Sequence, residues 1–300
     1  MFRDALKKIL KYRSHVRGLF NPFIGFQINS IGNYIGVNEL KREVPIVISM
    51  TSYRERFKDL PKTIYSLLNQ TLKPDRVILW LDDESENLNT LPYEITRFIK
   101  NGLEIKFRKD IGAYTKAIYA FKECPESVIV TADDDIYYSN DWLKRLYLSY
   151  ISHPEDVQVH RAHRVLISEN VILPYERWEK HCGEERNGYD LFLTGVGGVL
   201  YPPNCFTKEV LREDIFLKCA PAADDIWFWV MSLVHGRKVR IVQNHYKSLI
   251  STNILRQLFC KNLYKQNQAG GNDEQLQNLL KFYGNNVLNR LSVSTDKRNQ

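Results

Sequence analysis

Segments with the pattern of strands and of helices alternate between residues 44 and 132, and this alternation restricts the fold more than any other feature of the sequence. Strands joined through helices form a mostly parallel sheet, because parallel neighbours need a long crossover and such crossovers are right-handed. We therefore predict an α/β fold in which helices flank a mostly parallel sheet. The predicted strands cover residues 44–50, 75–85, 103–108 and 127–132, and the predicted helices cover residues 60–70, 93–102 and 113–124, with a further helix opened by Ser139, Asn140 and Asp141.

The rhythm changes after residue 150, which predicts a second, mixed half of the fold. This half is expected to contain strands at 156–167 and 237–242, a Gly-punctuated apolar stretch at 189–203, a buried helix at 222–236 and a late helix at 273–284. The resulting domain organisation is a basic N-terminal segment (1–43), a single compact domain (44–284) with halves 44–150 and 151–284, and a polar tail (285–300).

Acidic side chains follow two of the predicted strands. Asp133, Asp134 and Asp135 come directly after residues 127–132, and Asp82 and Asp83 end the second strand. The carboxyl ends of parallel strands meet at one edge of the sheet, where open α/β folds bind their ligands. Carboxylate oxygens are the ligands that Mg²⁺ and Mn²⁺ prefer. The alternative interpretation is a solvated acidic turn, since Asp is common in turns.

Charge and cysteine content exclude several classes of protein. The formal net charge is +7, but residues 1–18 hold six Lys and Arg against Asp4 alone, so the remainder of the chain is nearly neutral and nucleic-acid binding is not expected. Phe2, Leu6 and Ile9 recur there at near-helical spacing, which predicts a basic amphipathic helix on an anionic membrane surface through residues 1–20. An ordinary surface helix is the alternative. Five cysteines without C-x-x-C spacing favour a reducing compartment over a disulfide framework or a zinc site.

Four short motifs, in this order, resemble those of the GT-A glycosyltransferases, in particular the family-2 type. They are "TSYR" at 51–54, "LDD" at 81–83, "DDD" at 133–135 and "PAADDIW" at 221–227. The resemblance spans about residues 44–242 and implies a GT-A (Rossmann-like) fold. Its first half would bind the nucleotide sugar and its second half the acceptor.

The resemblance implies roles for individual residues on the donor side. Thr51 and Tyr53 would meet the nucleotide, with Tyr53 stacked on the base, and Asp82 would meet the uracil. The acidic cluster would hold Mn²⁺ or Mg²⁺ on the diphosphate, with Asp135 as the first choice of ligand and Asp133 as the second. Asp134 is expected to reach the ribose instead.

Each of the further candidate residues has both a functional and a structural interpretation. Lys116 would contact the phosphates of the donor, or else be an ordinary exposed helix lysine, and His245 would be a late metal ligand or a single surface histidine. Asp225 is expected to be the catalytic base, with Asp224 as the alternative; adjacent helix positions diverge by about 100°, so both cannot face one proton. Capping of the helix by its acids is the competing structural explanation.

Three further patterns, which involve glycines, a late turn and two histidines, have less direct interpretations. A sugar that approaches the backbone closely, or a tight bulge, would explain the glycines at Gly195, Gly197 and Gly198. Residues 270–274 are expected to form either a loop that closes over the donor or a turn with a helix cap. His160 and His163 lie three apart in a predicted strand and make a poor metal pair.

The predicted function is metal-dependent transfer of one sugar from a nucleotide sugar, expected to be a UDP-sugar, to a glycan or glycolipid. The resemblance implies inversion and a role in bacterial surface polysaccharide (capsule or lipopolysaccharide) synthesis, with the enzyme cytoplasmic and peripheral on the inner membrane. Two departures are noted: the acidic pair is Asp-Asp instead of Glu-Asp, and the Q-x-x-R-W pattern of processive synthases is absent. The alternatives are a nucleotidyltransferase or hydrolase, a retaining glycosyltransferase, or a non-catalytic membrane-associated module. The nucleotidyltransferase is disfavoured, because such enzymes of related fold usually have a Gly-rich loop after the first strand, whereas the stretch "SMTSYRERF" contains no Gly.

Overall fold

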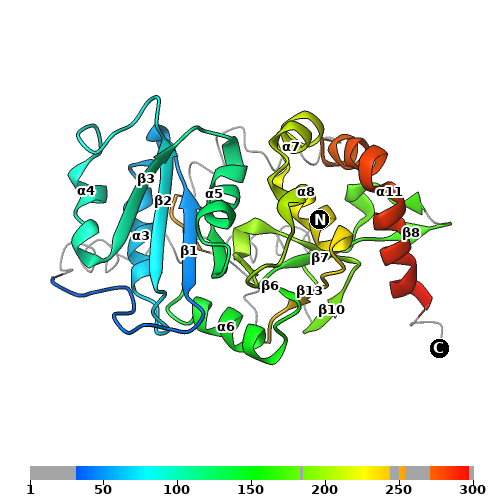
Figure 1. Ribbon diagram of the computed structural model, residues 1–300, viewed down its shortest axis with the longest axis horizontal. Helices are drawn as coiled ribbons and strands as arrows, with labels where there is room; N and C mark the ends of the chain where they lie inside the picture. The colour runs from blue at the N-terminus through cyan, green and yellow to red at the C-terminus, as the bar shows by residue number, and fades with distance from the viewer. Residues whose placement is uncertain (1–31, 170, 183–184, 244–249, 254–270, 297–300) are drawn as a thin grey trace, which may run out of the picture.

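The computed structural model describes residues 32–169, 171–182, 185–243, 250–253 and 271–296 (Figure 1). Its centre is an eight-stranded sheet with the strand order β10-β13-β6-β12-β4-β1-β2-β3. The strands are β1 Ile46–Thr51, β2 Arg76–Asp82, β3 Leu103–Arg108, β4 Val128–Ala132, β6 Val157–Val159, β10 Arg186–Gly188, β12 Val199–Tyr201 and β13 Val239–Ile241.

The first half of the sheet is parallel, as the alternation predicts. β4, β1, β2 and β3 run in one direction, and Met50 lies opposite both Leu79 and Ala132, so that the strands end close to one another. The second half is mixed: β12 is antiparallel to both β4 and β6, whereas β13 is parallel to β6. The predicted α/β class and the mixed character of the second half are both confirmed.

Helices cover the two faces of the sheet. α3 and α6 pack on one face with side chains such as Ile64 and Trp142, whereas α5, α8 and α11 pack on the other with side chains such as Ile118 and Trp229. Strand residues alternate between the two cores, as the two-residue period of a strand requires. The helices are α3 Leu60–Leu68, α4 Tyr93–Thr96, α5 Thr115–Glu123, α6 Trp142–Ser152, α7 Glu213–Cys219, α8 Asp224–Val234 and α11 Asn272–Asp296.

Short elements complete the fold. Three two-stranded pairs lie outside the main sheet: β5 Ile136–Tyr137 with β14 Ile250–Ser251, β7 Ala162–Arg164 with β11 Leu191–Leu193, and β8 Ile167–Ser168 with β9 Val171–Ile172. The 3₁₀ turns are η1 Arg54–Arg56, η2 Ile99–Asn101, η3 Gly112–Tyr114, η4 Tyr175–Arg177, η5 Gly195–Gly197 and η6 Lys208–Leu211.

Three predicted boundaries were wrong. The helix expected at 93–102 is interrupted: α4 ends at Thr96 and η2 leads to Gly102, whose φ of 105° stops the helix. The strand expected at 156–167 is broken into β6, β7 and β8, because β6 joins the main sheet while β7 pairs with β11. The late helix does not give way to a polar tail at residue 285. α11 continues to Asp296, and it buries Val287 and Leu291 in the core.

The described residues contain no helix long and apolar enough to cross a membrane. The predicted amphipathic segment at residues 1–20 lies outside the described part of the chain. Cys124, Cys182, Cys205 and Cys219 are buried and form no disulfide.

Candidate active site

The site lies where β1, β2 and β4 end, and Lys116 of α5 is at its centre. The Nζ atom of Lys116 is 2.6 Å from Oδ1 of Asp133, which follows β4, and 3.4 Å from Oδ2 of Asp224, which begins α8. Lys116 is 8% exposed, so it is not the exposed helix lysine of the alternative interpretation. Burial acts to lower the pKa of Lys116, but Asp133, Asp224 and Asp225 outweigh it and hold that pKa well above the usual range. Lys116 is therefore a charged link between the two acidic motifs.

The two acids at the start of α8 point to different partners, as helical geometry predicts. Oδ1 of Asp225 accepts a hydrogen bond of 2.9 Å from the backbone N–H of Gly195. A Cβ atom at Gly195 would lie 2.9 Å from this oxygen, so the close approach needs glycine. Burial and the neighbouring Asp224 raise the pKa of Asp225 well above the usual range. Oδ2 of Asp224 is sealed from solvent and accepts no hydrogen bond.

The other two acids of the cluster face Arg56 of η1. Its Nη1 atom is 2.7 Å from Oδ2 of Asp135 and 3.2 Å from Oδ1 of Asp134. Asp134 also accepts a hydrogen bond of 2.6 Å from the Ser52 hydroxyl. Burial raises the pKa of Asp134 to about 6 even though Arg56 and Ser52 act to lower it, and burial together with Asp133 raises the pKa of Asp135.

The residues predicted to contact the nucleotide lie at this same edge of the sheet, but they differ in how far their side chains are already engaged within the fold. Tyr53 is 52% exposed, and its ring lies 5.5 Å from the Arg56 guanidinium. The Thr51 hydroxyl donates to the carbonyl of Trp80, so it is engaged within the sheet. Asp82 accepts hydrogen bonds from the backbone N–H and hydroxyl of Ser85, which lowers its pKa and orders the loop after β2.

Sequence reasoning missed three contributors to the site. Ser52 and Arg56 lie within the stretch after β1, but nothing in their spacing shows that they contact Asp134 and Asp135, which come much later in the chain. The Gly195 N–H was also missed, because Gly195 was considered only for its small size. Arg56 could have been found from its position, because a basic residue near the end of the first strand is a natural partner for an acidic cluster at the same edge of the sheet.

The carboxylates at this edge are the candidate ligands of a divalent cation. Among the described residues, no three His, Cys, Asp or Glu side chains converge as ligands of one metal ion. Five carboxylates, those of residues 133–135, 224 and 225, share the two cations Lys116 and Arg56 in this part of the chain. The excess of carboxylates over cations at this edge fits a hard divalent cation with oxygen ligands. His245 lies outside the described residues.

The other predicted features are structural. His160 is buried against the carbonyl of Trp142, and His163 accepts from the backbone N–H of His181, so the two histidines do not form a metal pair. Gly198 has a φ of 86° and lies against Trp142, whose indole donates to the Gly197 carbonyl. At 271–274 the chain begins α11, which favours the helix cap over a loop above the donor.

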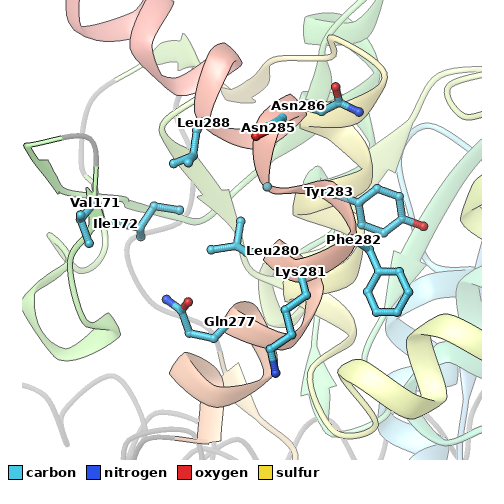
Figure 2. A pocket seen from close by; sticks show the side chains of 11 residues that line it. Val171, Ile172, Gln277, Leu280, Lys281, Phe282, Tyr283, Asn285, Asn286 and Leu288 are labelled. Atoms are coloured by element: carbon cyan, nitrogen blue, oxygen red, sulfur yellow. The ribbon is translucent and has the colours of Figure 1, made fainter.

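A separate hollow of about 580 Å³ lies between α11 and the β8–β9 hairpin. Figure 2 shows Val171 and Ile172 on the hairpin facing Leu280, Leu288 and Gln277 of α11. The hollow contains none of the acids described above. The candidate active site is therefore the edge at Lys116 and not this hollow.

Comparison with known proteins assigns the chain to a family. The family model for glycosyl transferase family 2 matches residues 47–214, more than half of the chain, and ends before Asp224. No curated protein matches the sequence.

Two solved structures are distantly similar. CMP:2-keto-3-deoxy-manno-octonic acid synthetase complexed with CTP is 10% identical with a TM-score of 0.41, covering 65% of this chain and 88% of that one. S. aureus TarS (1–349) in complex with UDP is 15% identical with a TM-score of 0.46, covering 69% of this chain and 59% of that one. From the family match over an α/β fold with this acidic edge, we conclude that the chain belongs to glycosyl transferase family 2 and is a GT-A glycosyltransferase with a nucleotide-sugar donor.

Proposed function

We propose that this chain transfers one sugar from a UDP-sugar to a glycan or glycolipid acceptor, with inversion and with Mn²⁺ or Mg²⁺ as cofactor. The observation that carries the proposal is the link through Lys116, which contacts Asp133 at the end of β4 and Asp224 at the start of α8. It supports a single site in which one acidic group serves the donor and the other serves the acceptor.

On the donor side, the exposed Tyr53 ring offers a surface on which a uracil base stacks. Asp135 and Asp133 would hold the divalent cation, with His245 as a further candidate ligand. When bound, the cation supplies Lewis-acid stabilisation of the charge that grows on the leaving diphosphate. Arg56 and Lys116 already contact these carboxylates, so both must shift contacts as the cation and donor bind.

On the acceptor side, Asp225 is proposed as the general base. The Gly195 N–H holds Oδ1, which orients the carboxylate and leaves Oδ2 for the proton of the acceptor hydroxyl. A raised pKa favours this role, because a base works best when its pKa approaches the working pH. Asp224 is the weaker candidate, since its Oδ2 is sealed from solvent and lies against Lys116. We therefore assign Asp224 to positioning Lys116.

UDP titration with and without Mn²⁺, followed by turnover of UDP-sugars with NMR of the anomeric product, tests the proposal. We expect UDP to bind more tightly with Mn²⁺ and the product to have the opposite anomeric configuration to the donor. Retained configuration would refute the assignment of Asp225 as the base for direct displacement. An equal affinity for UDP in the presence and absence of Mn²⁺ would refute the proposed metal site.

The proposed place of action is the cytoplasmic face of the membrane, in bacterial surface polysaccharide synthesis. The support is the excess of Lys and Arg in residues 1–18. Deletion of residues 1–18 should reduce sedimentation with anionic liposomes and leave UDP binding unchanged. Equal sedimentation of the truncated and full-length chains at low salt would contradict membrane attachment through this segment.

A further inference from the structure

Arg56 of η1 contacts the carboxylate that is the first choice of metal ligand. Its Nη1 atom lies 2.7 Å from Oδ2 of Asp135, and within the part of the chain that the structure describes this is the one salt bridge of Asp135. The same Nη1 atom lies 3.2 Å from Oδ1 of Asp134. A divalent cation on Asp135 would therefore lie close to a guanidinium of the same sign and would need the same oxygens. The two positive groups compete for one carboxylate.

Arg56 is free to move without disturbing the core. None of the residues of η1 is buried, and the Arg56 side chain is partly exposed. Lys116, the other cation of the site, is buried and lies between Asp133 and Asp224. Of the two cations, Arg56 is thus the one whose departure frees Asp135.

The acidic cluster keeps its course when the guanidinium leaves, because other groups hold its backbone. The carbonyl of Asp134 accepts a hydrogen bond of 2.8 Å from the hydroxyl of Thr63 on α3. The carbonyl of Asp135 accepts one of 2.8 Å from the backbone N–H of Thr252, which follows β14. The carboxylates are therefore held in place for a second cation.

The Arg56 side chain also contacts the proposed platform for the nucleotide base. Its Nε atom donates a hydrogen bond of 3.1 Å to the hydroxyl of Tyr53. Arg56 thus lies between Tyr53 and Asp135, and the phosphates that join a base at Tyr53 to a cation at Asp135 must pass beside it. Guanidinium groups form strong, charge-assisted hydrogen bonds to phosphate oxygens.

The charge of Arg56 is constant across the working pH range. Burial acts to lower the pKa of Arg56, but Asp134 and Asp135 outweigh it and raise that pKa. A change of partner is therefore the way in which Arg56 yields the carboxylates, since it does not lose its proton.

We propose that Arg56 is an internal counter-cation of the metal site, which competes with the divalent cation for Asp135 and Asp134 and exchanges these carboxylates for the phosphates of the donor. The inference rests on the proposed function, since it concerns the same metal and donor. Its consequence is that metal and nucleotide bind cooperatively, because each gives Arg56 a reason to leave the other's position.

The experiment measures the affinity for Mn²⁺ alone and with UDP, from the EPR signal of the free ion. The proteins are the wild type, Arg56→Gln, Arg56→Lys, which keeps a cation, and the matched control Arg54→Gln. Arg54 belongs to the same turn, but its Nη2 atom lies 2.7 Å from Oε2 of Glu86, outside the acidic cluster. Melting temperatures show that each variant is folded.

Without UDP, we expect Arg56→Gln to bind Mn²⁺ about 10-fold more tightly than the wild type, since a charge-assisted contact no longer has to be broken. Arg56→Lys should stay closer to the wild type, and Arg54→Gln should match it. UDP should raise the affinity for Mn²⁺ by a smaller factor in Arg56→Gln than in the wild type. Equal or weaker Mn²⁺ binding by Arg56→Gln, or an equal effect of UDP in the two proteins, would overturn the proposal.

A second measurement on the wild type covers the case in which Arg56→Gln does not fold. Mg²⁺ titration, followed by NMR of the arginine Nε–H groups and assigned with Arg56→Lys, should shift the signal of Arg56 and leave that of Arg54 unchanged. An unmoved Arg56 signal at saturating Mg²⁺ would also overturn the proposal. Turnover of UDP-sugar by the wild type with Mn²⁺, together with no gain in Arg56→Gln, would refute this inference alone. A gain in Mn²⁺ affinity without any turnover would refute the proposed function instead.

Discussion

Lys116 is the residue whose replacement tests the organisation of the site most directly. Lys116→Met keeps the length and removes the charge that contacts Asp133 at 2.6 Å and Asp224 at 3.4 Å. With an effective dielectric constant of about 20, these contacts are worth roughly 6 and 5 kcal/mol before desolvation is subtracted. Desolvation of a buried ammonium offsets several kcal/mol, and loss of one partner of a buried ion pair typically costs about 3–5 kcal/mol.

The expected loss is a large part of the total stability, which for a domain is about 5–15 kcal/mol. Its pH dependence is the sharper test. Lys116 acts to lower the pKa of Asp225, so in the variant that pKa rises further above its unfolded value. A raised folded pKa contributes stability that is present at low pH and lost as pH rises, so the deficit should be larger at about pH 8 than at about pH 5.5.

Chemical denaturation of wild type, Lys116→Met and the control Lys122→Met at both pH values measures these differences. Lys122 is exposed on the same helix, and its replacement should change the free energy of unfolding by no more than about 0.5 kcal/mol. A deficit for Lys116→Met below about 1 kcal/mol, or one that does not change with pH, would refute the reasoning.

Three other outcomes are expected. Asp225→Asn should lower turnover by about 10²–10⁴-fold with near-normal UDP affinity, as general-base catalysis predicts, while Asp224→Asn costs less; normal rates in both would remove α8 from the mechanism. Asp135→Asn should abolish the Mn²⁺-dependent part of UDP binding while the melting temperature stays near that of the wild type, and an unchanged Mn²⁺ effect would exclude this ligand. His163, with its pKa lowered to about 3, cannot take up the proton that the unfolded chain binds below about 6.5, so stability falls as the pH drops through this range, by about 2 kcal/mol at pH 5. His163→Asn, which can still accept from the His181 N–H, should lose this acid sensitivity in urea titrations, and an unchanged pH profile would contradict the assignment.

The first half of the fold could be predicted because its signals are local. Apolar strands, helices between them and acids at the strand ends all follow from short patterns, and the parallel order follows from the crossovers. The break after Val159 was not predictable in this way, since it depends on which strand becomes the partner of each segment. The late helix was predicted to end too early for a similar reason, since Val287 and Leu291 look isolated in the sequence and are buried only by tertiary packing.

For the site, the sequence predicted which types of residue take part but not which side chains contact one another. The acids of β4 and α8 could be identified, but only the fold shows that Lys116 contacts both groups. Arg56 illustrates the same limit, because its pairing with Asp135 joins segments that are distant in sequence.

The position of β12 has a consequence for how the molecule assembles. β12 comes from the second half of the chain but pairs with β4 of the first half, at the edge of the parallel strands. A fragment ending near residue 150 would leave β4 as an open edge, and such edges recruit other chains and aggregate. During synthesis, about 70 further residues must therefore follow β4 before β12 can pair with it. Because strands of both halves share one sheet, we expect the halves to fold as one cooperative unit, and a split between them is expected to yield insoluble pieces and not separate modules.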